Sequence, residues 1–196
     1  MSSLSADIRR LEEDLTAHPM RISAYHDLPF AILRYDAEEE WDLRREVRRL
    51  AVRLGNAGKR VRAISLAYLL WEAIEDCEGL DDVVELERER GFEVAQQQVT
   101  TYLSDPDWRP LPDLLAEYLE PLDPERDIAF LVRGSAMAPA IYHMSRLLDE
   151  MQGRTQVTTI LFYPGTLDGT TGLRFMGLKS REAMGNYRVT ASAWDP

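Results

Sequence analysis

The sequence predicts an α/β protein built on a mainly parallel sheet with helices on both faces. This would be a Rossmann-like or P-loop-like three-layer sandwich that lacks a phosphate-binding loop. Short apolar runs alternate along the chain with longer segments whose apolar residues recur at helical spacing. The run at 127–133 is apolar enough to be a strand buried on both faces. The last two short runs follow each other without a helix, so we also expect an antiparallel edge.

The N-terminal part is expected to form a helix, a strand and a second helix. Apolar residues recur at helical spacing over 4–17, and the helix ends at His18 because the residue before a proline is pushed out of the α region. The apolar run at 29–35 is the first predicted strand. A long helix is predicted over 37–54, with acids in its first turns and arginines in its last, which complements the helix dipole.

The middle of the chain is expected to be a helical insertion between two strands. Residues 59–66 are predicted to form the second strand, and 127–133 the third. The helical pattern over about 67–126 is broken near Gly91. It is broken again by a loop at 104–110.

The C-terminal third is expected to return to strands. The predicted elements are a helix over 139–151, a strand over 158–163, a turn at Pro164 and Gly165, and short strands over 172–176 and 186–190. No internal repeat or linker marks a boundary, so 1–196 is taken as one domain.

Composition excludes several classes of protein. No window approaches the ~18 consecutive apolar residues of a membrane span, and the charged N-terminus has no apolar signal region. The single cysteine, Cys77, suits a reducing compartment, so a cytoplasmic location is expected. The net charge is −11, with acids concentrated in 75–90 and 105–127. Direct contact with nucleic acid is not expected, because phosphate binding needs a basic footprint.

Motifs for nucleotide chemistry are absent. A phosphate-binding loop would place glycines and a lysine after the first strand, where this chain has Tyr-Asp-Ala-Glu-Glu-Glu. The glycine-rich run at 165–172 carries no lysine. The three histidines of the chain show no metal-ligand spacing, and Ser135 does not lie in a nucleophile elbow. We therefore expect no catalytic residue, no metal and no cofactor.

The candidate binding residues lie beyond the carboxyl ends of the strands, where open α/β sheets bind ligands. They are Asp36, Arg133, Tyr163, Asp168, Arg174, Arg181 and Arg188. If the arginines converge with Tyr163 and Asp168, they could hold an anion or an acidic peptide by bidentate contacts. A pairing of these arginines with the chain's own acids is the competing interpretation.

Several C-terminal motifs carry a resemblance to a known family. They are Phe130 to Pro139 (FLVRGSAMAP), Ser145 to Thr155, Leu161 to Thr166 (LFYPGT), Gly172 to Leu178 (GLRFMGL) and Arg181 to Val189. Together they resemble the BrxB family of BREX bacteriophage-exclusion systems. The resemblance runs through nearly the whole chain and is densest from Asp127 to Val189.

The resemblance implies an accessory component of a phage-defence island, encoded beside an ATPase, a DNA methyltransferase and the alkaline-phosphatase-like PglZ. The family supplies no catalytic residues to carry over. The leading hypothesis is a non-catalytic, protein-binding subunit whose expected partner is PglZ-like, with other BREX components as further partners. One alternative is a nucleotide- or nucleic-acid-sensing domain that uses the strand-end crevice. A third is a Mg²⁺-dependent phosphoesterase or nuclease that uses Asp36 and Asp168.

Overall fold

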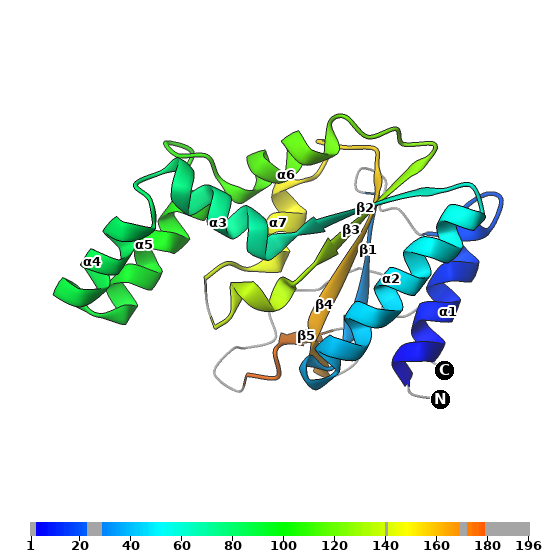
Figure 1. The fold of residues 1–196 in the computed structure, drawn as a ribbon, viewed down its shortest axis with the longest axis horizontal. Coiled ribbons are helices and arrows are strands. Elements are labelled where there is room, and N and C mark those ends of the chain that lie inside the picture. The colour runs from blue at the N-terminus through cyan, green and yellow to red at the C-terminus, as the bar shows by residue number, and fades with distance from the viewer. Residues whose placement is uncertain (1–2, 23–28, 140, 169–171, 179–196) are drawn as a thin grey trace.

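The computed structural model describes residues 3–22, 29–139, 141–168 and 172–178 (Figure 1). Its elements are α1 (Ser3–Thr16), β1 (Phe30–Tyr35), the 3-10 helix η1 (Ala37–Glu39), α2 (Glu40–Asn56), β2 (Arg60–Ser65), α3 (Leu66–Asp76), α4 (Leu80–Arg90), α5 (Phe92–Ser104), α6 (Leu111–Leu119), β3 (Asp127–Val132), η2 (Gly134–Met137), α7 (Met144–Glu150), β4 (Thr158–Asp168) and β5 (Gly172–Phe175). The predicted strand over 186–190 lies outside the described residues.

The sheet has the strand order β1-β4-β3-β2, and these four strands are parallel. The fold class predicted from the sequence is therefore confirmed. β1 and β2 lie at opposite edges although only α2 separates them along the chain (Figure 1). β5 pairs antiparallel with the last part of β4, from Gly165 opposite Phe175 to Asp168 opposite Gly172.

The strands divide the apolar side chains between the two faces of the sheet, because successive residues of a strand point to opposite sides. Ala31, Leu33 and Tyr35 of β1 pack with the buried faces of α1 and α2. Phe30 and Ile32 of the same strand pack on the opposite side. Helices therefore cover both faces of the sheet, as the sequence predicted.

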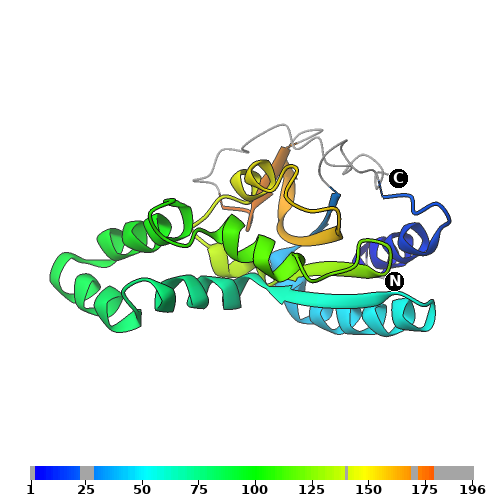
Figure 2. The same ribbon diagram turned by 90° about the horizontal axis from the view of Figure 1, so that it is seen from above.

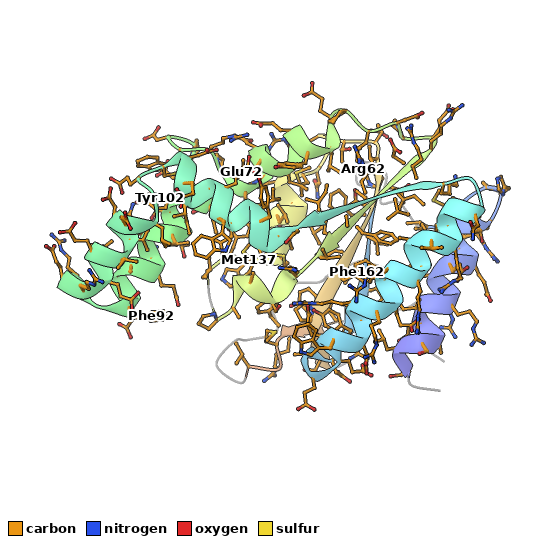
Figure 3. All side chains as sticks on the ribbon, viewed as in Figure 1. Arg62, Glu72, Phe92, Tyr102, Met137 and Phe162 are labelled. Carbon is orange, nitrogen blue, oxygen red and sulfur yellow. The ribbon has the colours of Figure 1, made fainter. Side chains whose placement is uncertain are left out.

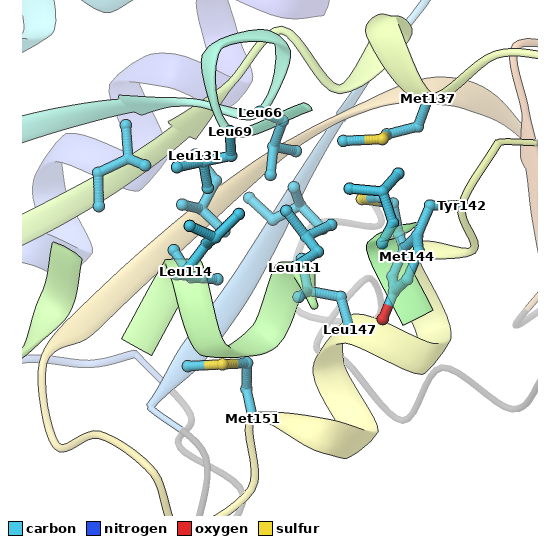
Figure 4. Packing of buried hydrophobic residues seen from close by; sticks show 14 of the residues in the cluster. Leu66, Leu69, Leu111, Leu114, Leu131, Met137, Tyr142, Met144, Leu147 and Met151 are labelled. Carbon is cyan, nitrogen blue, oxygen red and sulfur yellow. The ribbon is translucent and has the colours of Figure 1, made fainter. Parts of the chain in front are cut away.

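The larger core lies between the sheet and helices α3, α5, α6 and α7. Figure 4 shows Leu66 and Leu69 of α3 facing the leucines of α6, with Met144 and Leu147 of α7 closing the cluster. Burying one such leucine or methionine stabilises the fold by about 1.5–3 kcal/mol. This packing fixes α3 and α6 against the sheet beside β2.

Pro164 and Gly165 do not form the predicted turn; β4 continues through both to Asp168. The dipeptide stands where β4 leaves its partner β1 and takes up β5, and the Pro164 carbonyl accepts a hydrogen bond from Met176 N at 2.9 Å. A Cβ on Gly165 would lie 2.4 Å from the Arg174 carbonyl oxygen. Glycine is thus needed for close approach of two backbones, not for a turn.

The helix predicted from residue 139 begins only at Met144. His143 is extended, and the segment before it is held by other contacts. Ile141 N donates to Met137 O at 3.1 Å, and Ile141 O accepts from the Thr100 hydroxyl at 2.9 Å. These contacts with η2 and α5 override the helical pattern that the sequence shows there.

Helices α3 to α6 form the predicted insertion between β2 and β3. Within it, α4 and α5 form a helical hairpin that projects away from the sheet (Figures 1 and 2). Val83 is the one buried residue of α4. Among the helices of the described part of the chain, none is long and apolar enough to cross a membrane.

Candidate functional site

The parallel strands bring three chain segments together at the carboxyl end of the sheet. Tyr35 at the end of β1 lies opposite Pro164 of β4. Gly134, which follows β3, lies so close to β4 that an added Cβ would be 3.1 Å from Pro164 Cδ. The residues after β1 and β3 therefore lie on either side of β4, at the edge where the sequence predicted a site.

Asp36 is held by an arginine of its own strand. The Arg34 guanidinium donates to Asp36 Oδ1 at 2.9 Å and to the Gly165 carbonyl at 3.3 Å. Asp36 also begins η1, where its backbone carbonyl accepts from Glu39 N at 2.8 Å. This carboxylate thus positions Arg34 against β4, and the pair is half-exposed.

Glu40 is used in a second local network. The Tyr35 hydroxyl donates to Glu40 Oε2, and Arg44 Nε donates to Glu40 Oε1 at 2.8 Å. Burial and the neighbouring carboxylate raise the pKa of Tyr35 well above its usual range. The network fastens the start of α2 to the end of β1.

Arg133 differs from the other strand-end arginines. Its backbone has φ 61° and ψ 40°, a left-handed conformation that non-glycine residues adopt at a cost. The side chain is exposed and forms no hydrogen bond or ion pair with any residue of the described part of the chain. Strained backbone of this kind is often retained at binding sites.

Tyr163 and Arg174 lie further along the β4–β5 pair. Tyr163 is 2% exposed, and its ring packs edge-to-face on Phe175 with the ring centroids 5.6 Å apart. Arg174 lies opposite Thr166 and is half-buried. Tyr163 is therefore a buried core residue at this end of the sheet, while Arg174 has a partly exposed positive charge.

The structure describes little of the remaining predicted site residues, Asp168, Arg181 and Arg188. Asp168 pairs with Gly172 along the backbone, and its side chain is outside the description. Arg181 and Arg188 both lie outside the described residues. A role in binding stays a prediction for all seven candidates. Among the described residues, no group of three His, Cys, Asp or Glu is placed to hold a metal ion.

Sequence reasoning missed a polar cluster where α3 and α6 meet. The Arg109 guanidinium bonds to carboxylates of both helices, namely Glu72 and Asp76 of α3 and Glu117 of α6. The Tyr118 hydroxyl donates to Glu72 at 2.8 Å, and its ring meets that of Tyr68 edge-to-face. The signal for this cluster in the sequence was two tyrosines, Tyr68 and Tyr118, that lie outside the apolar positions of their helices.

A groove of 690 Å³ runs between this cluster and β2. Its walls are Val61, Arg62, Ala63 and Ile64 of β2 on one side, and Glu72, Arg109, Glu117, Tyr118, Pro121 and Leu122 on the other. Figure 3 labels Arg62 and Glu72 on these two sides. A second cavity, of 830 Å³, lies between α6 and residues 153–157, where Arg154 pairs with Asp113 at 2.7 Å.

The α4–α5 hairpin, here called the arm, presents two exposed apolar side chains, Phe92 and Val94, among charged residues at its tip. All residues from 87 to 94 are exposed, and Phe92 is 58% exposed (Figure 3). At the base of the arm Tyr102 is buried, and its hydroxyl donates to Glu78. The base is thus fixed to the core while the tip contacts solvent.

Comparison with known proteins gives one match. The model of the family described as BREX protein BrxB matches residues 62–190, well over half of the chain. The matched range includes the arm, the groove, Arg133 and the β4–β5 pair. No curated protein and no solved structure matches the chain.

Proposed function

The chain belongs to the BrxB family and is thus a component of a BREX phage-defence system, and we propose that it serves there as a cytoplasmic, non-catalytic subunit that binds another protein. The proposed partner is the PglZ-like component beside which BrxB-like proteins are encoded. Other components of the system are further partners.

The arm is the observation that carries this proposal. Phe92 and Val94 are 58% and 41% exposed at its tip. Aromatic residues such as phenylalanine are enriched at the buried centres of protein interfaces, where a few anchor residues provide most of the binding energy. A fixed base with an exposed aromatic side chain at the tip suits insertion of that side chain into a pocket of a partner.

The polar networks at the strand ends support the non-catalytic part of the proposal. The Asp36 carboxylate is engaged by Arg34, and the Glu40 carboxylate by Tyr35 and Arg44. Asp36, which the sequence offers for Mg²⁺-dependent chemistry, therefore has a structural partner within the chain.

Co-expression of the tagged chain with the other genes of the island tests the proposal. The expected result is a stoichiometric complex with the PglZ-like protein that survives moderate salt. Phe92→Asp should reduce recovery of the partner by more than about tenfold, since losing an interface anchor costs at least about 2 kcal/mol.

Trp41→Asp is the matched control, because Trp41 is 70% exposed on α2, far from the arm. Both substitutions change an exposed aromatic residue. Phe92→Asp should alter stability by no more than about 0.5 kcal/mol, and Trp41→Asp by up to about 1 kcal/mol because the Arg44 guanidinium lies 4.6 Å from the centre of its ring. Recovery of the chain alone from the co-expressing cells would overturn the proposal.

A second candidate function rests on Arg133. An exposed arginine that has no side-chain partner among the described residues, in a strained backbone at the carboxyl end of the sheet, suits recognition of a nucleotide or nucleic-acid phosphate. Calorimetry with nucleotides and short DNA tests it, and Arg133→Ala should abolish any heat observed. No heat at high ligand concentration with the wild-type chain removes this candidate.

A further inference from the structure

Among the described residues, β2 is the outermost strand at one edge of the sheet and pairs only with β3. Arg60 N donates to Arg126 O at 2.9 Å, so the peptide groups of Arg60, Arg62 and Ile64 face β3. The alternation of a parallel ladder then directs the N–H and C=O groups of Val61 and Ala63 outward.

The outward peptide groups line the groove beside α6. Val61 and Ala63 both contribute to its wall. Their outward peptide groups form no backbone hydrogen bond with any described segment across the groove. On the far side of the groove Tyr118, Pro121 and Leu122 offer partly exposed apolar surface. A strand added to β2 would find hydrogen-bonding groups and a pocket for alternate side chains together.

The charge of the β2 edge determines which kind of segment can pair with it. Lys59, Arg60 and Arg62 make the edge basic, within a chain whose net charge is −11. Arg60 is neutralised by Asp127 in a bidentate pair at 2.7 and 2.9 Å. Arg62 is exposed and has no hydrogen-bond or ion-pair partner among the described residues.

The same charge argues against a second copy of this chain as the occupant. Pairing two β2 edges would bring their basic residues into opposition, and like charges on facing strands destabilise a sheet. An acidic segment would instead pair with Arg62. Its acids have to face β2, because the Arg109 cluster across the groove has more carboxylates than arginines.

We infer that the outer edge of β2 binds an extended, acidic segment of a partner protein, which adds a strand to the sheet and places a side chain in the groove beside Tyr118. This surface is separate from the arm. The inference therefore holds whichever protein the arm contacts.

Selection of a displayed library of random 12-residue peptides on the full chain tests the inference. The enriched peptides should alternate apolar and acidic residues, and binding of a synthetic copy should protect the amides of Val61 and Ala63 from hydrogen exchange. Because it needs no other defence protein, this experiment can succeed or fail independently of the co-expression test.

Ala63→Pro and Arg62→Glu are the decisive variants. Proline at residue 63 removes one outward N–H and leaves the β3 ladder intact, as edge strands tolerate. Each variant should weaken the synthetic peptide by at least about tenfold, equivalent to the loss of roughly 1.4 kcal/mol. Trp41→Asp, which changes an exposed residue outside β2 and outside the groove, should bind as the wild type does.

Three outcomes would overturn the inference. These are no enriched peptide, enriched peptides that bind Ala63→Pro and Arg62→Glu unchanged, and a dimer of the chain that Ala63→Pro dissociates. If Ala63→Pro does not fold, Arg62→Glu and the amide protection in the wild type still decide the question.

Discussion

At the scale of single residues, the carboxyl end of the sheet is organised by arginines. The Arg34 guanidinium bridges Asp36 and the Gly165 carbonyl. Glu40 accepts hydrogen bonds from both Arg44 and the Tyr35 hydroxyl. Both carboxylates therefore act within the fold. Arg133 has no such partner among the described residues, which makes it the strand-end side chain best placed to meet a ligand.

Gly165 gives a direct test of the close approach between β4 and β5. An alanine Cβ at this position would lie 2.4 Å from Arg174 O and 2.7 Å from Tyr163 Cε1, so one strand has to move. We expect Gly165→Ala to lower the free energy of unfolding by about 1–3 kcal/mol, the usual cost of overpacking. Urea denaturation measures it.

Gly55→Ala is the matched control for that substitution. Gly55 lies in α2, and an added Cβ there meets no atom within 4 Å. Alanine should therefore stabilise the chain slightly, by up to about 1 kcal/mol, through helix propensity. Equal effects of the two substitutions would contradict the packing described for β4 and β5.

Burial of Tyr163 shows where residue-level prediction from the sequence stops. Alternation along β4 places Tyr163 on the same face as Leu161, and both lie in the core beneath the helices. Both faces of this strand are covered, so alternation alone cannot tell an exposed tyrosine from a buried one. The left-handed backbone of Arg133 likewise has no sequence signal, since the residue is not a glycine.

At the scale of elements, helical periodicity locates the insertion but not the arm. The break at Gly91 was visible in the sequence, and α4 ends there. That α4 packs mainly on α5 and projects from the sheet depends on tertiary contacts. Tertiary contacts also decide the conformation of Pro164 and Gly165. The Pro-Gly pair predicts a turn, but β4 continues through both residues.

Tyr102 connects the arm to the body and gives its attachment a pH dependence. Burial, together with the hydrogen bond to Glu78, raises the pKa of Tyr102 to about 12. The unfolded chain releases this proton near pH 10. The stabilisation is therefore complete below about pH 10 and is lost as the pH rises from there towards 12.

Tyr102→Phe should lower the free energy of unfolding at neutral pH by about 1 kcal/mol, the worth of one hydrogen bond. It should also reduce the further loss between pH 10 and 12, because the variant has no phenol to ionise. Urea titrations at a series of pH values measure both effects. The other tyrosines are unchanged, so the difference from the wild type isolates Tyr102.

Glu78→Gln is the companion variant for Tyr102. The amide can still accept the hydrogen bond but carries no charge, so the Tyr102 pKa should move back towards 10. The alkaline loss should then still begin near pH 10, but it should be smaller and end at a lower pH than in the wild type. An alkaline profile identical in the wild type and both variants would contradict this attachment of the arm.

At the scale of the whole molecule, surfaces of different character lie far apart. The arm carries the exposed Phe92 at one end of the molecule, while β2 presents a basic edge of the sheet (Figures 1 and 3). The fold class, the insertion and the acid-rich helices were predictable from periodicity and composition. The basic edge was not, because it depends on β2 being the outermost strand.

Phage plating on cells that carry the complete defence island tests the central claim, binding of a partner through the arm, most directly. Phe92→Asp should abolish protection although the chain accumulates to the wild-type level, while Trp41→Asp should protect as the wild type does. Full protection by Phe92→Asp at normal protein level would contradict the account.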